Sequence, residues 1–341
     1  MEKRNVPIIE TRGLRKVFRS VTREPGIGGA FRALFSRKFE EKVAVENVTM
    51  SLDAGELVGY IGPNGAGKST TIKMLTGILV PSGGEIRVAG IVPHAHRIEN
   101  AANIGVVFGQ RSQLYWDLPL RESFELLREI YDVPRDRYLQ NLAHFSKILD
   151  LDRFMATPVR QLSLGERMRG DFAAAMMHDP KIVYLDEPTI GLDVVAKEAI
   201  REFIAEINEQ RGTTVILTTH DLADVERLCR RLVLIDEGTI IYDGSVERLR
   251  TEYGTHRVLV VTLAGAYPDF AIDGAEVVKR DGAVVQLRFD RHLMSAETLI
   301  RRVLDAYAIV DMAIVEPDIE GIVRRIYLDG YSERIVAGSP S

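Results

Sequence analysis

The residues with the clearest chemical use lie in one glycine-rich loop. Residues Gly62–Ser69 read Gly-Pro-Asn-Gly-Ala-Gly-Lys-Ser and fit the phosphate-binding pattern G-x-x-x-x-G-K-[ST]. Glycines let backbone N–H groups approach phosphate oxygens with no Cβ in the way, and the N-terminus of a following helix adds a favourable dipole. Lys68 would neutralise charge on the β- and γ-phosphates of a nucleotide, and Ser69 would ligate Mg²⁺.

The segments on either side of this loop have the character needed to hold it. Leu57–Ile61 is a short apolar run typical of a buried strand. Thr70–Leu79 follows, and the spacing of Ile72, Leu75 and Leu79 predicts a helix with those side chains on one face. The alternative is a glycine-rich turn that happens to precede a helix. Strand, loop, Lys-Ser pair and helix together favour the phosphate loop.

A pair of adjacent acids is the second candidate group. The apolar run Lys181–Leu185 predicts a buried strand that ends at Asp186 and Glu187, because Pro188 forces the strand to end. Ligands of parallel α/β sheets sit beyond the carboxyl ends of strands, so Asp186 would meet Mg²⁺ beside Ser69. Glu187 would accept a proton from an attacking water. The alternative is an ordinary strand-to-turn acid pair, and the preceding phosphate loop argues against it.

The third candidate group begins a helix. Ser163 and Gly165 lie in the run Leu162–Arg169, where a hydroxyl and backbone N–H groups at a helix N-terminus form an anion site. A plain helix cap explains the same residues, with Ser163 as the cap and Glu166 completing a capping box. The two interpretations are compatible, since a capped helix end can still direct its dipole at a partner's phosphate.

Composition limits the class of protein. The 341 residues are 46% hydrophobic and 27% charged, as in an ordinary globular protein large enough for one or two cores. A net charge of −5 provides no basic field for nucleic acid, and one cysteine, Cys229, excludes an intrachain disulfide framework. The sequence has no signal-peptide core and no apolar run near the roughly 18 residues that span a bilayer. A membrane role would therefore depend on a partner subunit.

The hydrophobic pattern also predicts the elements that position these groups. Lys181–Leu185 and Thr214–Thr218 predict parallel strands joined by a helix over Ala196–Gln210. The pattern of Leu118–Asp171 is mostly helical and predicts a separate lobe. Near Arg250 the pattern changes to short strands and helices, which predicts a small C-terminal α+β domain.

One segment fits none of these elements. Residues Arg19–Lys42 combine six basic side chains with Phe31, Leu34, Phe35 and Phe39. Two interpretations stay open for it: a short basic amphipathic helix at a membrane surface, or a solvated insertion.

Taken in chain order, these groups resemble the motifs of the nucleotide-binding subunit of ATP-binding cassette (ABC) transporters. The resemblance covers roughly residues 8–245. The family's Walker A loop corresponds to Gly62, Pro63, Asn64, Gly65, Ala66, Gly67, Lys68, Ser69 and Thr70. Its other motifs correspond to Gln110 (Q-loop), Leu162–Glu166 (signature), Ile182–Glu187 (Walker B), Gly191–Asp193 (D-loop) and His220 (switch histidine).

The resemblance implies a fold and a domain organisation. The fold class is α/β: a P-loop NTPase of the ABC cassette type, with a RecA-like mixed sheet core, an antiparallel β subdomain and a helical lobe, followed by a small C-terminal α+β domain. Residues 1–245 would form the ATPase domain, with the helical lobe at about 111–171 and the insertion at about 19–42. Residues 255–332 would form the accessory domain and 333–341 a flexible tail.

The resemblance also implies roles for individual residues. Those expected to be catalytic are Glu187, His220 and Lys68, and those expected to hold Mg²⁺ are Ser69, Gln110 and Asp186. Beyond the Walker A loop, ATP would be contacted by Gln110, Ser163, Gly165, Asp193 and an aromatic side chain that stacks on adenine. Phe18 is our choice for that aromatic, and Phe39 is its competitor.

The chain departs from the family pattern in two motifs. The usual signature is Leu-Ser-Gly-Gly-Gln, and here Leu164 replaces its first glycine and Glu166 its glutamine. Ser163 and Gly165, which would face the phosphate, are kept, so we expect activity to survive. The Q-loop carries one extra residue, which makes Gln113 an alternative to Gln110.

The function implied is that of an ATP-binding and ATP-hydrolysing subunit. ATP-driven dimer closure would be coupled to export through a separate integral-membrane permease. Ser163 and Gly165 of one copy would close over ATP held by another, with a homodimer expected at the cytoplasmic face of the cell membrane. The permease would dock near Gln110–Leu120, and Leu114-Tyr115-Trp116 would belong either to that dock or to the lobe's own core.

Four features suggest a branch of the family, and two other classes of protein compete with it. The runs Thr70–Leu75 and Ile190–Asp193, with the insertion and the extra domain, resemble ABC-2-type exporters. One competitor is a soluble ABC ATPase acting on ribosomes or DNA, against which the acidic balance and the single cassette argue. The other is a phosphate-loop kinase or GTPase, which would leave Leu162–Glu166 and His220 unexplained.

Overall fold

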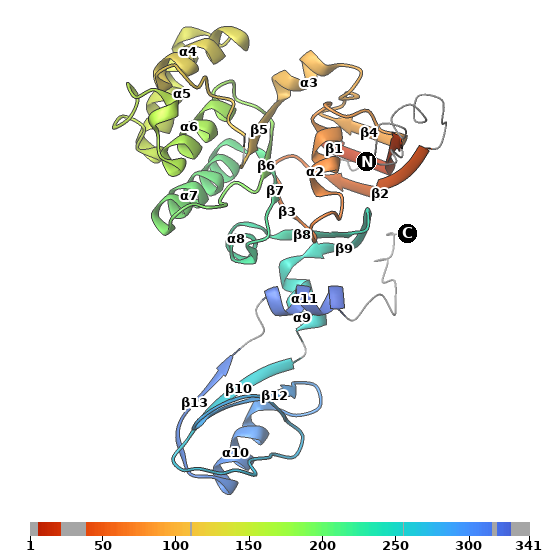
Figure 1. The fold of residues 1–341 in the computed structure, drawn as a ribbon, viewed down its shortest axis with the longest axis vertical. Helices are drawn as coiled ribbons and strands as arrows, with labels where there is room; N and C mark the ends of the chain where they lie inside the picture. The colour runs from red at the N-terminus through yellow and green to blue at the C-terminus, as the bar shows by residue number, and fades with distance from the viewer. Residues whose placement is uncertain (1–5, 22–38, 110, 255, 316–318, 329–341) are drawn as a thin grey trace, which may run out of the picture. The chain divides into compact units, whose positions relative to one another are not determined.

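The computed structural model describes residues 6–21, 39–109, 111–254, 256–315 and 319–328 (Figure 1). The backbone divides into two compact units. One comprises Met1–Asp243 with Ile335–Ser341, and the other is Gly244–Arg334. Most of the predicted basic segment, residues 22–38, and the predicted tail lie outside the described residues.

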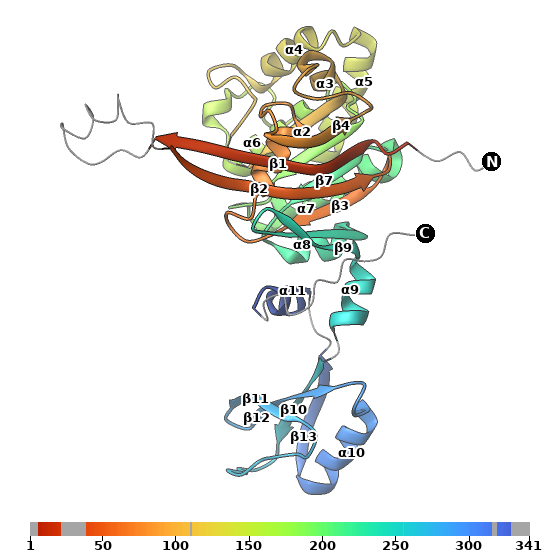
Figure 2. The same ribbon diagram turned by 90° about the vertical axis from the view of Figure 1, so that its right-hand side faces the viewer.

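A nine-stranded sheet forms the frame of the first unit, in the order β4-β1-β2-β9-β8-β3-β7-β6-β5. Its strands are β1 (Ile9–Val21), β2 (Phe39–Leu52), β3 (Leu57–Ile61), β4 (Gly83–Val88), β5 (Ile104–Phe108), β6 (Ile182–Asp186), β7 (Thr214–Thr218), β8 (Arg231–Asp236) and β9 (Thr239–Ser245). The strands β8, β3, β7, β6 and β5 are mutually parallel. In contrast, β1 pairs antiparallel with both β2 and β4, and Figure 2 shows β1 and β2 as two long neighbouring strands that point in opposite directions.

Helices flank this sheet, and several gather into a lobe. They are α2 (Lys68–Leu75), α3 (Arg97–Asn103), α4 (Leu120–Ile130), α5 (Arg135–Leu149), the 3-10 turn η1 (Val159–Gln161), α6 (Leu164–Met176), α7 (Val194–Arg211) and α8 (Leu222–Leu228). Figure 1 shows α4, α5 and α6 together at one end of the unit and β1, β2 and β4 at the other. The mostly helical pattern of Leu118–Asp171 is confirmed by α4, α5 and α6.

The core strands form because their sequences are apolar throughout. Every residue of β3 and of β7 is buried, as are the first four of β6, which is the pattern of parallel strands covered on both faces. The predicted unit of two parallel strands with an intervening helix is confirmed, since β6 and β7 pair in parallel on either side of α7 in the chain.

One predicted helix is shorter than its apolar spacing suggested. The run Thr70–Leu79 was expected to be helical throughout, but α2 ends at Leu75. Gly77 takes a left-handed backbone angle, φ 77°, which terminates the helix. Leu79 therefore lies beyond the helix, although it still packs on the same core as Ile72 and Leu75.

The second unit contains its own sheet, in the order β11-β12-β10-β13. Its elements are α9 (Val246–Tyr253), β10 (His256–Leu263), β11 (Glu276–Asp281), β12 (Val284–Asp290), α10 (Ala296–Ala306), β13 (Ile309–Val315) and α11 (Ile319–Leu328). Leu299 and Val303 of α10 share a core with Val261 and Leu287 of the sheet, so this unit has a separate hydrophobic centre.

Candidate functional site

The glycine-rich loop connects β3 directly to α2, as its sequence predicted. Gly67 caps α2 with φ 108°, a backbone angle that side chains rarely tolerate. A Cβ at Gly67 would lie 2.6 Å from the carbonyl oxygen of Ala44, and one at Gly62 would lie 2.3 Å from that of Ile235. Glycine is therefore required at both positions by packing within the protein as well as by any approach of a phosphate.

The side chain of Lys68 bonds to the backbone of the glycine-rich loop that contains it. Its Nζ donates to the carbonyl oxygens of Gly62, at 2.5 Å, and of Pro63, at 3.1 Å. Burial lowers the pKa of Lys68, and the nearby carboxylates of Glu187 and Asp186 act in the opposite direction. The ammonium group is thus held at the loop by weak neutral acceptors, which phosphate oxygens would readily replace.

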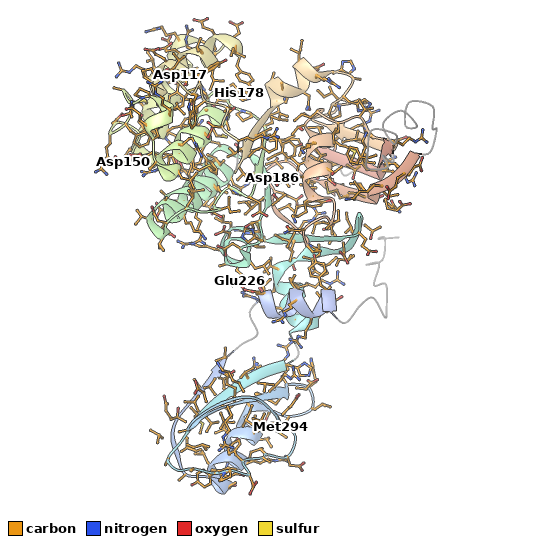
Figure 3. The ribbon with its side chains drawn as sticks, viewed as in Figure 1. Asp117, Asp150, His178, Asp186, Glu226 and Met294 are labelled. Carbon is orange, nitrogen blue, oxygen red and sulfur yellow. The ribbon has the colours of Figure 1, made fainter. Side chains whose placement is uncertain are left out.

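Ser69 and Asp186 meet, although 117 positions separate them in the chain. The Ser69 hydroxyl donates to Asp186 Oδ2 at 3.1 Å, and Thr218 Oγ1 donates to Asp186 Oδ1 at 2.5 Å. Figure 3 labels Asp186 near the middle of the unit, between the helical end and the β1–β2–β4 end. A hydroxyl and a carboxylate at this spacing are the oxygen donors that Mg²⁺ prefers, so the pair fits that ion.

Glu187 turns away from its neighbour because the strand ends. Its φ is 54°, a left-handed angle unusual for a residue with a side chain, and its backbone N–H donates to Thr218 O at 3.0 Å. The two adjacent acids consequently diverge. Asp186 contacts Ser69, and Glu187 Oε2 lies 2.5 Å from Nδ1 of His220, whose side chain is 65% exposed.

A cleft of about 760 Å³ collects these groups at the carboxyl ends of the parallel strands. Its lining comprises Phe18, Lys42, Ala44, Asn64, Gly65, Gly67, Lys68, Ser69, Thr70, Lys73, Ile78, Phe108, Gly109, Arg111, Asp186, Glu187 and Ile190. The cleft therefore brings together the predicted loop, both acids and the predicted aromatic. Four cations line it as well, which suits a polyanionic ligand.

The structure describes the side chain of only one of the two aromatic candidates and of one of the two glutamine candidates. Phe18 lines the cleft, with Lys16 Nζ 5.3 Å from its ring centre, whereas the side chain of Phe39 lies outside the described residues. Gln110 also lies outside them, although its neighbours Gly109 and Arg111 line the cleft. The alternative, Gln113, points to the helical lobe, since its Nε2 donates to the backbone oxygen of Asp171 on α6.

The signature residues form the predicted capping box. Ser163 caps α6, and Glu166 Oε2 accepts from both the backbone N–H and the hydroxyl of Ser163, at 2.9 and 2.8 Å. These bonds hold the pKa of Glu166 below its usual range. The glutamate found in place of glutamine thus orients Ser163, so the replacement has a structural use within the chain.

The same signature turn packs against the D-loop. A Cβ at Gly165 would lie 3.1 Å from the Cβ of Ala196, and one at Gly191 would lie 3.2 Å from Cδ2 of Leu164. Asp193 caps α7 by accepting from the N–H of Ala196 at 2.8 Å. Neither Ser163 nor Gly165 is among the described residues that line the cleft.

Several residues of the cleft were not predicted from the sequence. Thr218 fixes Asp186, and Lys42, Lys73 and Arg111 add positive charge to the lining. Thr218 could have been predicted from the sequence, because it ends β7, the strand that pairs with β6, and β6 ends at Asp186. The three cations had no comparable signal, since basic residues are common on any protein surface.

Comparison with known proteins decides the family. A model of the ABC transporter family matches residues 45–190. The chain is 34% identical over 218 residues to the ABC transporter ATP-binding protein NatA of Bacillus subtilis, covering 63% of this chain and 88% of that protein. The chain belongs to the ABC transporter ATP-binding proteins.

Other relatives and solved structures agree with that family. The daunorubicin resistance ATP-binding protein DrrA3 of Streptomyces coeruleorubidus is 31% identical over 299 residues, covering 86% of this chain and 91% of that protein. A solved ATP-binding subunit of an ABC transporter superposes with a TM-score of 0.60 at 26% identity, over 72% of this chain and 93% of that one. A dimeric post-hydrolysis ATP-binding cassette bound to ADP and Pi superposes with a TM-score of 0.58 at 25% identity. The superposition covers 70% of this chain and 98% of that one.

Membership of this family makes the chain an ATP hydrolase with an ABC cassette fold, and both expectations are confirmed. Within the described ranges, each helix is either too short or too polar to cross a bilayer.

Proposed function

We propose that this chain powers an exporter by clamping ATP between two copies of itself. The observation that carries the proposal is the separation of two sets of residues within one chain. The cleft holds Lys68, Ser69, Asp186 and Glu187, whereas Ser163 does not line it and is exposed at the start of α6. A second copy would supply the missing hydroxyl and helix N-terminus to the open side of the nucleotide.

In the closed dimer the side chains of the cleft divide the binding of ATP and its hydrolysis between them. Lys68 exchanges its two carbonyl acceptors for phosphate oxygens. Ser69 and Asp186, with Gln110, would hold Mg²⁺, and that ion would neutralise phosphate charge. Glu187 orients the attacking water and takes its proton. His220, already in contact with Glu187, holds that carboxylate and reaches the γ-phosphate.

Two further residues would contact the nucleotide, and two aromatic side chains would contact the permease. Phe18, which lines the cleft, stacks on adenine. Asp193, which caps α7 by accepting from the N–H of Ala196, would contact ATP from the D-loop. Tyr115 and Trp116 are 41% and 54% exposed, whereas Leu114 is buried, so the two aromatics form the dock for a membrane permease. The subunit would therefore work peripherally at the cytoplasmic face of the membrane, with residues 255–332 as an accessory domain.

The export assignment draws on the relatives, which include linearmycin and daunorubicin resistance ATP-binding proteins and a Nod factor export ATP-binding protein. Its direct test is copurification: the tagged chain expressed with its native membranes should bring down an integral-membrane protein. Substituting both Tyr115 and Trp116 by Ser should abolish this capture and leave ATP hydrolysis intact. Capture that is unchanged would contradict the dock.

The sandwich is tested with Glu187→Gln, which keeps the shape of the side chain but cannot take a proton. With saturating ATP and Mg²⁺ this variant should stop turnover and migrate as a dimer in light scattering after gel filtration. The matched control, Glu187→Gln with Lys68→Ala, should stay monomeric because ATP binding is lost. If Glu187→Gln binds ATP with wild-type affinity and remains a monomer, the sandwich model is wrong.

A further inference from the structure

A buried carboxylate lies just behind the catalytic groups. Asp224, on α8, is only 1% exposed and accepts from Thr189 Oγ1 at 2.6 Å and from Arg201 Nε at 2.7 Å. A second N–H of the Arg201 guanidinium also donates to it. A charge this deeply buried persists only when its oxygens are well satisfied, so the three residues behave as one rigid unit.

The three members come from the three segments that carry the proposed chemistry. Thr189 follows Glu187 by two residues, and Asp224 follows His220 by four. Arg201 lies on α7, the helix that begins immediately after Asp193. The carboxylate of Asp224 therefore joins the turn after β6, the D-loop helix α7 and the helix α8 that follows His220.

Two further ion pairs strengthen the same junction between α7 and α8. Lys197 donates to Asp221 at 2.9 Å, and Arg227 pairs with Glu198. Asp221 is the N-cap of α8 and directly follows His220. Both pairs are partly exposed and contribute little each, so Asp224 is the member on which the junction chiefly depends.

The junction matters because the groups it supports are held in an unfavourable geometry. Glu187 has a left-handed φ of 54° and meets His220 at 2.5 Å. Such a conformation persists only where the surroundings determine it. A displacement of about 1 Å at a reacting group is enough to lower a rate by orders of magnitude.

We propose that Asp224 is a positioning residue for ATP hydrolysis, which acts through Thr189 and Arg201 to fix Glu187 against His220. The proposal rests on the function proposed above for Glu187 and His220. It differs from a purely stabilising role, because it assigns to Asp224 an effect on turnover with no effect on nucleotide affinity.

The test compares turnover, ATP affinity and the unfolding midpoint in the full-length protein. Asp224→Asn should lower kcat about tenfold and leave the affinity for a fluorescent ATP analogue unchanged. Thr189→Val, which removes the hydroxyl alone, should lower kcat similarly, and Thr189→Ser should restore it. The double variant should be no slower than the slower single variant, because both changes break one unit.

The matched control is Asp243→Asn, which removes a carboxylate on β9 that pairs with Arg231 at the first residue of β8, outside the group formed by Asp224, Thr189 and Arg201. It should shift the unfolding midpoint without changing kcat. An unchanged kcat in Thr189→Val, or equal losses in Thr189→Val and Thr189→Ser, would overturn the proposal. If Glu187→Gln itself still hydrolysed ATP, the proposed function would fail instead, so the two failures are distinguishable.

Discussion

Replacing Asp171 by asparagine should make the helical lobe more stable at neutral pH. Asp171 is buried on α6, where its Oδ1 accepts from Ser112 Oγ at 2.9 Å and from the backbone N–H of Gln113 at 3.0 Å. Burial raises the pKa of Asp171 to about 6, although these donors and Arg167 act in the opposite direction. An asparagine Oδ1 in the same place can accept both hydrogen bonds without carrying charge.

The sign and size of the effect follow from the two pKa values. Below the unfolded pKa of 3.8 the carboxyl is neutral in both states and costs nothing. As pH rises, the unfolded chain releases its proton first, so stability is lost until pH passes the folded value. The shift of about two pH units corresponds to a loss of about 3 kcal/mol, nearly half of which develops between about pH 5 and 7.

The assay uses the chain's single tryptophan. Arg167, which acts on the Asp171 carboxylate, also has its guanidinium 5.8 Å from the ring centre of Trp116, so Trp116 fluorescence reports unfolding of the lobe. Urea midpoints of wild type and Asp171→Asn should differ progressively more, in favour of the variant, as pH rises from about 5 to 7. A difference in urea midpoint that stays constant from about pH 5 to 7, or that changes in favour of the wild type as pH rises, would refute the reasoning.

Two further outcomes are expected around the cleft. A Cβ at Gly109 would lie 2.2 Å from the carbonyl oxygen of Glu187. Gly109→Ala should therefore displace Glu187 and lower kcat at least about tenfold in a steady-state ATPase assay. An undiminished kcat would show that this turn tolerates the displacement. Phe18→Ala should weaken ATP binding by about 1 kcal/mol, or about fivefold, while Phe18→Trp retains it; equal affinities measured by calorimetry would remove Phe18 from the adenine site.

The local parts of the site could be predicted from the sequence. The phosphate loop, the strand that ends at Asp186 and the capping box of Ser163 and Glu166 each depend on residues a few positions apart. Glycine at Gly67 and proline at Pro188 restrict the backbone directly, so their consequences need no knowledge of distant segments. The family resemblance depended on the same local patterns.

Only the tertiary structure decided which of these pieces meet. Ser69 reaches Asp186 across 117 positions because β3, β7 and β6 are adjacent and end at one edge. Gln113 bonds to Asp171 on α6, and Asp224 accepts a hydrogen bond from Thr189. These partners too are determined by the order of the strands and the packing of the helices. Such contacts depend on how elements pack together, which the spacing of residues along the chain does not specify.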